Sequence, residues 1–418
     1  MSKTKPIPVD CCSSSGLISV EQAIEKILSP AIPVKETESV NILDALNRML
    51  ADDLFSTIDV PGYDNSAMDG YAVRSEDCKV SGNKLPITQR IPAGQVGTPL
   101  EKGTAARIFT GAPIPEGADA VVMQEMCDGN DSDVVINTVV SAGCNVRCAG
   151  EDIKKDSVVL NAGKRLRAQE LGLLASVGLA KFNVKRKLKV ATFFTGDELV
   201  DPGIAPGQSL APGQIYNSNR YTLRGLLQSM NCEIIDLGIV PDTLDATTTV
   251  LKKAAESADL VITSGGVSVG EEDYVRIALE KLGELSMWRI AMKPGKPVAF
   301  GKVGETLFMG LPGNPVSVFV TFLIFARALI LKLQGAEKYL LKPVSVIADF
   351  DWRKVSRQEY LRVRLMQKDT KIVAQLFPHQ GSGVLSSASW ADGLVEVAVG
   401  KEIKKSDMVN YFSFEGLC

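Results

Sequence analysis

The sequence predicts a multidomain protein with a central α/β domain and further β-rich parts. The chain has 418 residues, and at roughly 150 residues per domain this length corresponds to about three domains. Strand and helix patterns alternate over 187–334, which is typical of a parallel sheet with helices on both faces. Short strand patterns separated by Gly and Pro fill 61–148 and 335–418, which indicates two smaller β domains.

The start of the chain (1–60) and the segment 149–186 are predicted to form one elongated helical domain. A capping box begins at Ser19, and apolar residues then recur at helical spacing. A second helical pattern covers 42–54, and a third covers 168–176. The β-rich part between them is therefore expected to interrupt the helical domain as an insertion.

The two β domains are predicted from β-branched runs between turn signals. In the inserted domain, 61–148, the expected strands cover 105–109, 120–123 and 134–140. In the C-terminal domain, 335–418, they cover 344–348, 360–365, 372–376, 394–399 and 409–414. This succession of short strands favours a compact β-barrel.

The α/β domain is predicted to cover 187–334. Its expected strands are 188–193, 233–237, 260–262, 298–300 and 306–309. Its expected helices are 218–230, 244–257, 273–282 and 315–333. The longest apolar run, 318–326, ends at Arg327 and is too short to cross a bilayer, so we interpret it as part of a buried helix.

Composition excludes several classes of protein. The 46 basic and 49 acidic residues give a net charge of −3, which argues against a nucleic-acid partner. The sequence holds a single histidine, His379, so HExxH metalloproteases and His-rich zinc sites are excluded. The eight cysteines form no CxxC pair and the first residues lack the apolar core of a signal peptide. We therefore expect a cytoplasmic protein with reduced thiols and no membrane partner.

Polar residues follow each expected strand of the α/β domain. In open α/β sheets, ligands bind beyond the carboxyl ends of the strands, so these residues are candidates for one site. They are Thr195, Gly196, Asp197 and Glu198 after the first strand, Asp242 after the second, Ser264, Gly265, Gly266 and Asp273 after the third, Lys293 and Lys296 before the fourth, and Asn314 after the fifth. A single Asp after a strand is commonly a helix cap, but five such turns at one edge favour a ligand site.

These residues indicate ionic chemistry. The carboxylates offer hard oxygen ligands, which suit Mg²⁺ that bridges to phosphates. Lys293 and Lys296 offer cations for an oxyanion or a phosphate. The α/β segment contains no histidine, so a metal-assisted displacement at phosphorus is the reaction class that fits these side chains.

The string YDNSAMDGYAV at 63–73 resembles the signature of the MoeA family of molybdopterin molybdotransferases, which includes the E domain of gephyrin. Further strings similar to this family occur in family order, and the resemblance covers nearly the whole chain from Leu17. They are FTGAPIPEGAD at 109–119, GEDI at 150–153, TGDEL at 195–199, TSGGVSVG at 263–270, MKPGKP at 292–297, LPGNPVS at 311–317 and HQGS at 379–382.

The resemblance implies a chain of four parts, with a molybdopterin-binding α/β domain. It implies a homodimer whose site forms between the α/β domain of one chain and other parts of its partner. The implied reaction inserts molybdate into adenylylated molybdopterin and releases AMP, with a divalent metal, usually Mg²⁺. A separate molybdopterin adenylyltransferase is expected to supply the substrate, and molybdoenzymes or carrier proteins are expected to accept the product.

The resemblance also implies roles for individual residues. The catalytic set is Asp64, Asp152, Glu198, Asp242 and Asp273, of which the last three would bind the metal. The molybdate pocket is Lys293, Lys296, Pro297, Ser317, Arg362 and Ser382. The nucleotide and pterin side is Thr110, Thr195, Gly196, Asp197, Ser264, Gly265, Gly266 and Asn314. Asp64, Thr110 and Asp152 lie outside the α/β domain and would reach the site of the partner chain.

The sequence departs from the family pattern just before GEDI. Many relatives have a basic cluster there, whereas Cys148 and Ala149 leave Arg147 alone for anion steering. Two alternative functions remain open: a non-catalytic cofactor carrier or scaffold of the same fold, and a nucleotide-handling adenylyltransferase or pyrophosphatase. The acidic and basic site positions argue against a scaffold, and the string at 63–73 argues against the second alternative.

Overall fold

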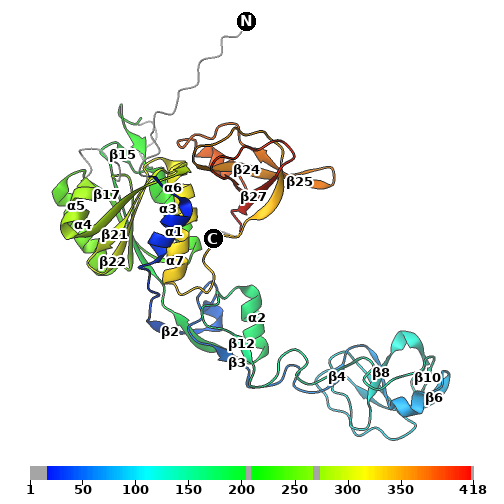
Figure 1. The fold of residues 1–418 in the computed structure, drawn as a ribbon. Helices are drawn as coiled ribbons and strands as arrows, with labels where there is room; N and C mark the ends of the chain where they lie inside the picture. Colours follow the sequence, from blue (N-terminus) through cyan, green and yellow to red (C-terminus); the bar gives the residue numbers. More distant parts are fainter. Residues whose placement is uncertain (1–16, 204–208, 267–273, 416–418) are drawn as a thin grey trace. The chain divides into compact units, whose positions relative to one another are not determined.

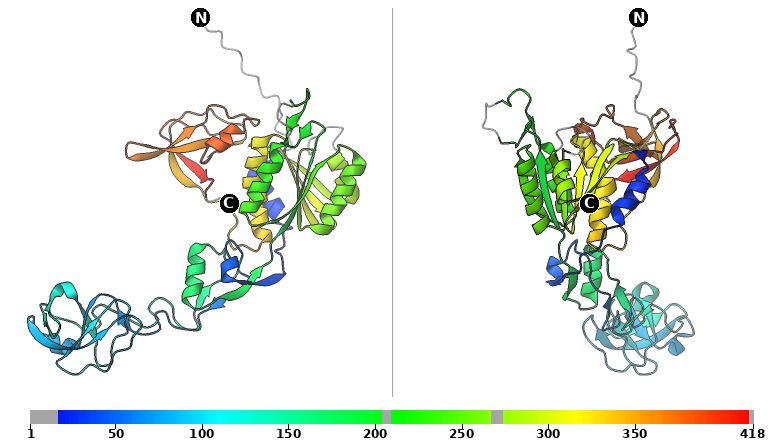
Figure 2. Two further views of the ribbon diagram at one scale, coloured as in Figure 1. Left: turned by 180° about the vertical axis from the view of Figure 1, so that it is seen from behind. Right: turned by 60° about the vertical axis from the view of Figure 1, so that its left-hand side comes forward.

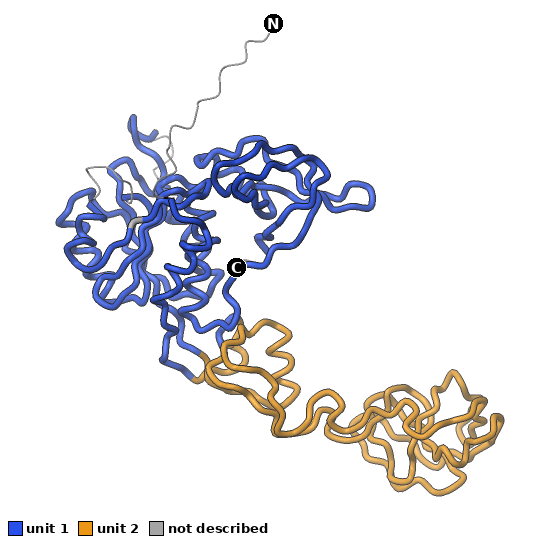
Figure 3. Tube along the Cα trace, viewed as in Figure 1, with its two compact units in different colours: residues 1–38, 47–49, 185–418 blue, residues 39–46, 50–184 orange. Residues whose placement is uncertain are grey.

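The computed structural model describes residues 17–203, 209–266 and 274–415. The chain divides into two compact units (Figure 3). Unit 1 comprises 1–38, 47–49 and 185–418, and unit 2 comprises 39–46 and 50–184. Unit 1 holds the α/β domain and the C-terminal β domain, whereas unit 2 holds the inserted β-rich domain.

The α/β domain is built on a seven-stranded sheet in the order β1–β19–β21–β22–β18–β14–β17 (Figure 1). The strands are β1 (Leu17–Ile18), β14 (Lys189–Thr195), β17 (Glu233–Val240), β18 (Leu260–Ser264), β19 (Gly283–Ile290), β21 (Pro297–Val303) and β22 (Thr306–Leu311). Strands β17, β14, β18 and β22 are parallel, as the alternation of strands and helices predicts. The five expected strands are all confirmed.

One strand of this sheet, β21, runs against its neighbours, which the alternation did not predict. Strand β21 runs antiparallel to both β22 and β19. A two-residue turn, Gly304 and Glu305, joins β21 to β22, and so short a connection reverses the chain. Because β21 is reversed, its first residue, Pro297, lies at the same edge as the carboxyl ends of the parallel strands.

Helices cover both faces of the sheet (Figure 2). Helices α4 (Leu244–Ser257) and α5 (Tyr274–Leu282) pack on one face. On the other face are α1 (Val20–Leu28), α3 (Ser218–Ser229), α6 (Pro315–Thr321) and α7 (Arg327–Leu333), and a π-helical turn at Phe322–Ala326 joins the last two. The expected helices of this domain are confirmed, and so is the capping box of α1.

The helical stretch Pro315–Leu333 is long and apolar enough to cross a membrane by composition, but 83% of its most apolar window is buried inside the fold. It packs against the sheet, α1 and α3 in the main hydrophobic cluster. Burial on all sides explains its continuous apolar sequence, because a helix in the middle of a core has no solvent-facing side. The expectation of a buried helix is confirmed.

The C-terminal domain is a closed β-barrel with one additional strand. Its strands are β20 (Met292–Lys293), β23 (Val344–Ala348), β24 (Gln358–Lys368), β25 (Lys371–Leu376), β26 (Gly393–Val397) and β27 (Met408–Ser413), and it carries one short helix, α8 (Ser386–Trp390). The long strand β24 pairs with both β25 and β26, which closes the barrel. Strand β20 pairs with the start of β24, so the segment before β21 is attached to the barrel.

Unit 2 contains a six-stranded sheet in the order β8–β5–β7–β6–β10–β9. These strands are β5 (Gly70–Val73), β6 (Asn83–Ile91), β7 (Ala105–Ile108), β8 (Ala120–Met123), β9 (Cys127–Gly129) and β10 (Asp133–Ile136). Two-stranded ladders and one helix precede or follow it: β2 (Thr37–Asn41) with β13 (Lys181–Lys185), β3 (Leu54–Phe55) with β12 (Val158–Leu160), β4 (Asn65–Ser66) with β11 (Val146–Arg147), and α2 (Ala168–Ser176). The three predicted strands of the insertion and the predicted helix α2 are confirmed.

The prediction of a helix over 42–54 is wrong. A single 3₁₀ turn covers Ile42–Asp44, and Asn47 then adopts a left-handed backbone conformation with φ of 63°. Leu50 donates its amide to the carbonyl of Lys164 and forms a β-bridge with Val184. Ala45, Met49 and Leu50 are buried, whereas Leu43 and Leu46 are exposed, so the long-range pairing at Leu50 overrides the helical spacing.

Candidate active site

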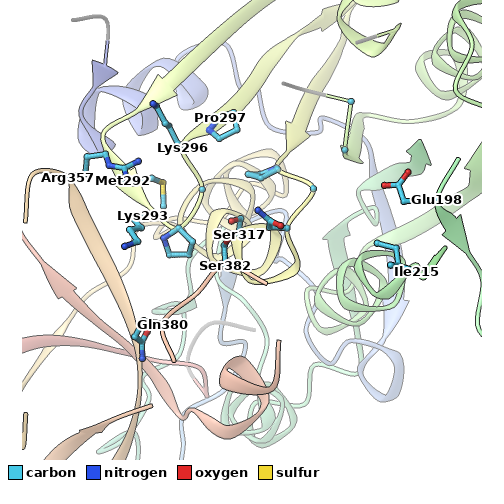
Figure 4. Close-up of a pocket in the computed structure, with 17 residues that line it drawn as sticks. Glu198, Ile215, Met292, Lys293, Lys296, Pro297, Ser317, Arg357, Gln380 and Ser382 are labelled. Atoms are coloured by element: carbon cyan, nitrogen blue, oxygen red, sulfur yellow. The ribbon is translucent and has the colours of Figure 1, made fainter. Parts of the chain in front are cut away.

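A cavity of about 630 Å³ lies at the edge of the sheet where the parallel strands end (Figure 4). Five segments of the α/β domain and two of the barrel contribute to its wall. The lining residues are Glu198, Ile215, Gly265, Gly266, Met292, Lys293, Pro294, Gly295, Lys296, Pro297, Pro312, Gly313, Asn314, Ser317, Arg357, Gln380 and Ser382. Nine of the residues predicted from the sequence are brought together here: Glu198, Gly265, Gly266, Lys293, Lys296, Pro297, Asn314, Ser317 and Ser382.

Glycines shape the turn after β18. Gly265 and Gly266 have φ of +93° and +62°, values that L side chains rarely adopt. A Cβ atom on Gly266 would lie 2.9 Å from the hydroxyl oxygen of Thr195 and 2.7 Å from a methyl carbon of Val275. The backbone of this turn therefore approaches β14 closely, and its two glycines line the cavity without side chains.

Cations gather on one side of the cavity. Lys293, Lys296 and Arg357 lie on the same side in Figure 4, with Met292 between them. The ammonium of Lys293 is 3.9 Å from a carboxylate oxygen of Glu359, which is buried in β24. Because β20 pairs with β24, the barrel holds Lys293 at this position.

Glu198 lies on the other side of the cavity, beside Ile215 (Figure 4). It directly precedes β15 (Leu199–Val200), which pairs with β16 (Ile215–Tyr216). The amide of Ile215 donates to the carbonyl of Glu198 with a distance of 2.8 Å. The cavity is thus polarised, with three cations at one end and a carboxylate at the other.

Sequence reasoning missed Arg357 and Gln380. Both come from the barrel, and Arg357 stands five residues before Arg362 at the start of β24. The string HQGS at 379–382 does contain Gln380, so that residue had a signal. Arg357 had none, because only the closure of the barrel against the α/β domain brings it to the cavity.

Arg362 does not line the cavity. Its side chain is fully buried, and its guanidinium donates to the hydroxyl of Ser387 at 3.0 Å and to the carbonyl of Gly381 at 3.1 Å. Burial lowers the pKa of Arg362 to about 10, so it keeps its charge at neutral pH. Arg362 therefore stands behind the loop that carries Gln380 and Ser382 and holds that loop in place.

The remaining predicted residues of the α/β domain that the structure describes do not line the cavity. Thr195 and Ser264 are buried at the ends of β14 and β18, and Asp197 is exposed. Gly196 follows Thr195 in the same turn. Asp242 follows β17 and is half-buried. The predicted ligand Asp273 falls outside the described residues.

Among the described residues, no group of three or more His, Cys, Asp or Glu side chains is placed to hold a metal ion. Of the two predicted metal ligands that the structure describes, Glu198 lines the cavity and Asp242 does not. A preformed cluster is not required for Mg²⁺, which keeps several waters and is commonly bound by one or two carboxylates together with substrate phosphates. A carboxylate at one end of an anion-binding cavity fits that mode of binding.

Unit 2 brings its own motif residues together at one surface. Strand β4 pairs with β11, and the amide of Ala149 donates to Asp64 at 2.8 Å. The amide and the hydroxyl of Thr110 both donate to one oxygen of Asp69, each at 2.8 Å. Asp64, Thr110 and Asp152 are all exposed. Three separate loops therefore present polar side chains to solvent.

Two of these contacts have electrostatic consequences. The amide of Thr110, followed by its hydroxyl, holds the pKa of Asp69 below its ordinary value, and Arg107 adds to this effect. In the loop that departs from the family pattern, the amide of Cys148 donates to a carboxylate oxygen of Glu151 at 3.1 Å.

Comparison with known proteins assigns the family. Three family models match the chain: the MoeA N-terminal region (domain I and II) at residues 18–178, a probable molybdopterin binding domain at 191–332, and the MoeA C-terminal region (domain IV) at 345–414. The chain is 43% identical over 381 residues to the molybdopterin molybdenumtransferase of Haemophilus influenzae, covering 89% of this chain and 92% of that protein. It is 42% identical over 313 residues to the molybdopterin molybdenumtransferase of a Nostoc species, covering 73% and 71%.

Solved structures agree with this assignment. The molybdopterin biosynthesis MoeA protein of Pyrococcus horikoshii OT3 superimposes with a TM-score of 0.81 at 30% sequence identity, covering 95% of this chain and 100% of that one. The three family models match successive parts of the chain between residues 18 and 414. This chain belongs to the MoeA family.

Proposed function

We propose that this protein is a molybdopterin molybdenumtransferase of molybdenum cofactor biosynthesis, which inserts molybdate into adenylylated molybdopterin and releases AMP. The observation that carries the proposal is the polarised cavity, with Lys293, Lys296 and Arg357 at one end and Glu198 at the other. Curated relatives at 43% and 42% identity have this enzyme name. Both reactants are anions, so a cavity rich in cations and backbone amides suits them.

Molybdate would occupy the cationic end. It is a tetrahedral dianion, and charge-assisted hydrogen bonds from lysine and arginine are the strong ones for such a group. The hydroxyls of Ser317 and Ser382 also line the cavity, and the amide of Val316 donates to the carbonyl of Ser382 at 3.0 Å. This link joins the start of α6 to the barrel loop, so donors from two domains converge on one anion.

Adenylylated molybdopterin would extend from this end toward Glu198. Its phosphates would meet the backbone of Gly265 and Gly266 and the start of α6 at Asn314, because glycine turns and helix amino termini favour negative charge. We propose that Glu198, Asp242 and Asp273 hold a divalent metal ion, with Mg²⁺ as the expected ion. When bound, such an ion supplies charge neutralisation at the leaving AMP phosphate.

We further propose that the protein acts as a homodimer in the cytoplasm. Asp64, Thr110 and Asp152 are exposed and belong to unit 2, and as a group they would complete the site of the partner chain. A separate molybdopterin adenylyltransferase would supply the substrate, and molybdoenzymes or carrier proteins would receive the product.

The test is a reconstituted reaction with purified protein, adenylylated molybdopterin, Mg²⁺ and molybdate. We expect AMP release that depends on molybdate and product that activates an apo-molybdoenzyme. AMP release without a functional cofactor would instead favour a pyrophosphatase. Tight binding without turnover would favour a carrier or scaffold, and either result would overturn the proposal.

A further inference from the structure

One amide side chain links the two turns that form the floor of the cavity. The Nδ2 atom of Asn219 donates to the hydroxyl of Ser264 at 2.9 Å and to the carbonyl of Gly313 at 2.7 Å. The hydroxyl of Ser264 in turn donates to the carbonyl of Pro312 at 3.0 Å. Asn219 and Ser264 do not line the cavity, whereas Pro312, Gly313 and the Gly265 that follows Ser264 do.

The two turns need such a link, because the sheet ladder ends just before them. The last paired residues of β18 and β22 are Ser264 and Leu311. Beyond them, the amide of Gly265 makes one longer contact of 3.3 Å to the carbonyl of Leu311. Glycines in both turns bring no side chains that would lock the backbone. The contacts of Asn219 and Ser264 are therefore what holds the turns side by side past the end of the ladder.

Asn219 is well placed for this task because the first turn of α3 is fixed on several sides. The side chain of Asn217 caps the helix by accepting from the amide of Arg220 at 3.2 Å. The guanidinium of Arg220 donates to Asp236 of β17 at 3.0 Å and pairs with Asp201 beyond β15. The amide that links the turns thus projects from a rigid support.

The other end of the same amide group has no partner. The Oδ1 atom of Asn219 is buried and accepts no hydrogen bond from the described residues. A buried acceptor without a partner is a cost to folding. The presence of an asparagine here is therefore better explained by the effect of its two donated hydrogen bonds on the cavity than by a gain in stability.

We infer that Asn219 is a positioning residue for adenylylated molybdopterin: it fixes the distance between the Ser264–Gly266 and Pro312–Asn314 turns, whose backbone would receive the phosphates. This inference rests on the proposed function. Molybdate would bind at the cationic end, which Asn219 does not contact. Asn219 would therefore affect the binding of adenylylated molybdopterin and not that of molybdate.

The kinetic experiment compares the wild type with Asn219→Ala, Asn219→Asp and the control Gln228→Ala, which removes an exposed amide from the same helix. Loss of the two donated bonds is expected to raise KM for adenylylated molybdopterin about tenfold, with KM for molybdate within about twofold of the wild type. Asn219→Asp keeps the size of the side chain and removes the donors, so it should match Asn219→Ala or exceed it. An equal rise in both KM values, or no rise in either, would overturn the inference.

A double-mutant cycle with Ser264→Ala tests whether Asn219 acts through its hydrogen bond to Ser264. If Asn219 acts partly through Ser264, the two substitutions will be non-additive in KM for adenylylated molybdopterin. Additive effects would mean that Asn219 does not act through Ser264.

Hydrogen exchange provides a measurement that does not depend on turnover. In Asn219→Ala, amides of both turns should exchange faster than in Gln228→Ala, while the strands β18 and β22 stay protected. Unchanged exchange in the turns would refute the inference even if the wild type released no AMP. A wild type without activity but with faster exchange in Asn219→Ala would refute the proposed reaction and leave the link between the turns standing.

Discussion

The cavity of unit 1 and the motif surface of unit 2 were both predicted from short sequence strings, yet the two regions are built differently. In unit 1, residues from Glu198 to Ser382 line one open cavity. In unit 2, Asp64 and Asp69 already accept hydrogen bonds from backbone amides, and their neighbours face solvent. In unit 1, cations and the glycine backbone are left to bind a ligand. In unit 2, part of the polar groups is used in hydrogen bonds within its own loops. A motif residue can thus accept hydrogen bonds that hold its loop and still carry an exposed charge that a partner chain could contact.

The largest effect is expected at the cationic end of the cavity. Lys296→Ala removes a charge-assisted contact to molybdate and should raise KM for molybdate by roughly 10- to 100-fold, with a much smaller effect on the adenylylated substrate. Steady-state kinetics with each substrate varied in turn will check this. Lys281→Ala, an exposed lysine at the end of α5, is the matched control. Equal loss for both substrates would mean that the two ends of the cavity do not serve separate anions.

A smaller effect is expected at the opposite end. Glu198→Gln should lower turnover about tenfold at limiting Mg²⁺, because removal of one electrostatic group in a site commonly costs at least this much. Higher Mg²⁺ concentrations should restore part of the rate. The exposed Glu256 of α4 offers a control as Glu256→Gln. A rate that is insensitive to both the substitution and the metal concentration would remove Glu198 from the metal site.

Two matched substitutions can separate the catalytic from the structural roles of the carboxylates at the motif surface of unit 2. Asp64→Asn and Asp69→Asn both keep an acceptor for the backbone amide while removing a charge. We expect Asp64→Asn to lower the rate of AMP release about tenfold with little change in Tm, since its charge would serve the reaction. Asp69→Asn should instead lower Tm and leave the rate close to that of the wild type. The opposite result would exchange the roles of the two carboxylates.

The smallest effect is a pH dependence of stability at Asp69. Hydrogen bonds from Thr110 lower the pKa of this carboxyl in the folded state. A lowered pKa contributes stability that is present above the unfolded pKa, about 3.9, and is lost as pH falls through the folded value. The difference in Tm between the wild type and Asp69→Asn should therefore be present at pH 7 and shrink below about pH 4. A constant difference would show that the charge of Asp69 does not stabilise unit 2.

Much of the fold could be predicted from periodicity. Strands buried on both faces and capped amphipathic helices give strong local signals, and the predicted bounds of α4 and β23 match the structure. The prediction of a helix over 42–54 failed because part of the segment is extended and pairs with distant residues such as Val184, while Leu43 and Leu46 stay exposed. Strand β19 was missed for a related reason: its place in the sheet is set by its antiparallel pairing with β21.

The site residues, like the elements of the fold, include some that could be predicted from the sequence and some that could not. Residues in turns after strands were predictable because the carboxyl ends of parallel strands meet at one edge, and Glu198, Gly265 and Asn314 confirm this reasoning by facing one cavity. Arg357 was not predictable, because its position depends on how the barrel closes. Arg362 was predicted as a ligand, and its place behind the loop depends on tertiary contacts to carbonyls that no sequence string encodes.

The central claim is that both regions serve one reaction at a site shared between two chains. It is tested most directly by mixing two inactive variants, Lys293→Ala/Lys296→Ala in the cavity and Asp64→Asn/Thr110→Ala in unit 2, under conditions that exchange subunits. Random exchange makes half of the dimers mixed, each with one intact composite site, so AMP release should recover to about a quarter of the wild-type rate. No recovery, from a mixture shown to contain mixed dimers, would contradict the claim.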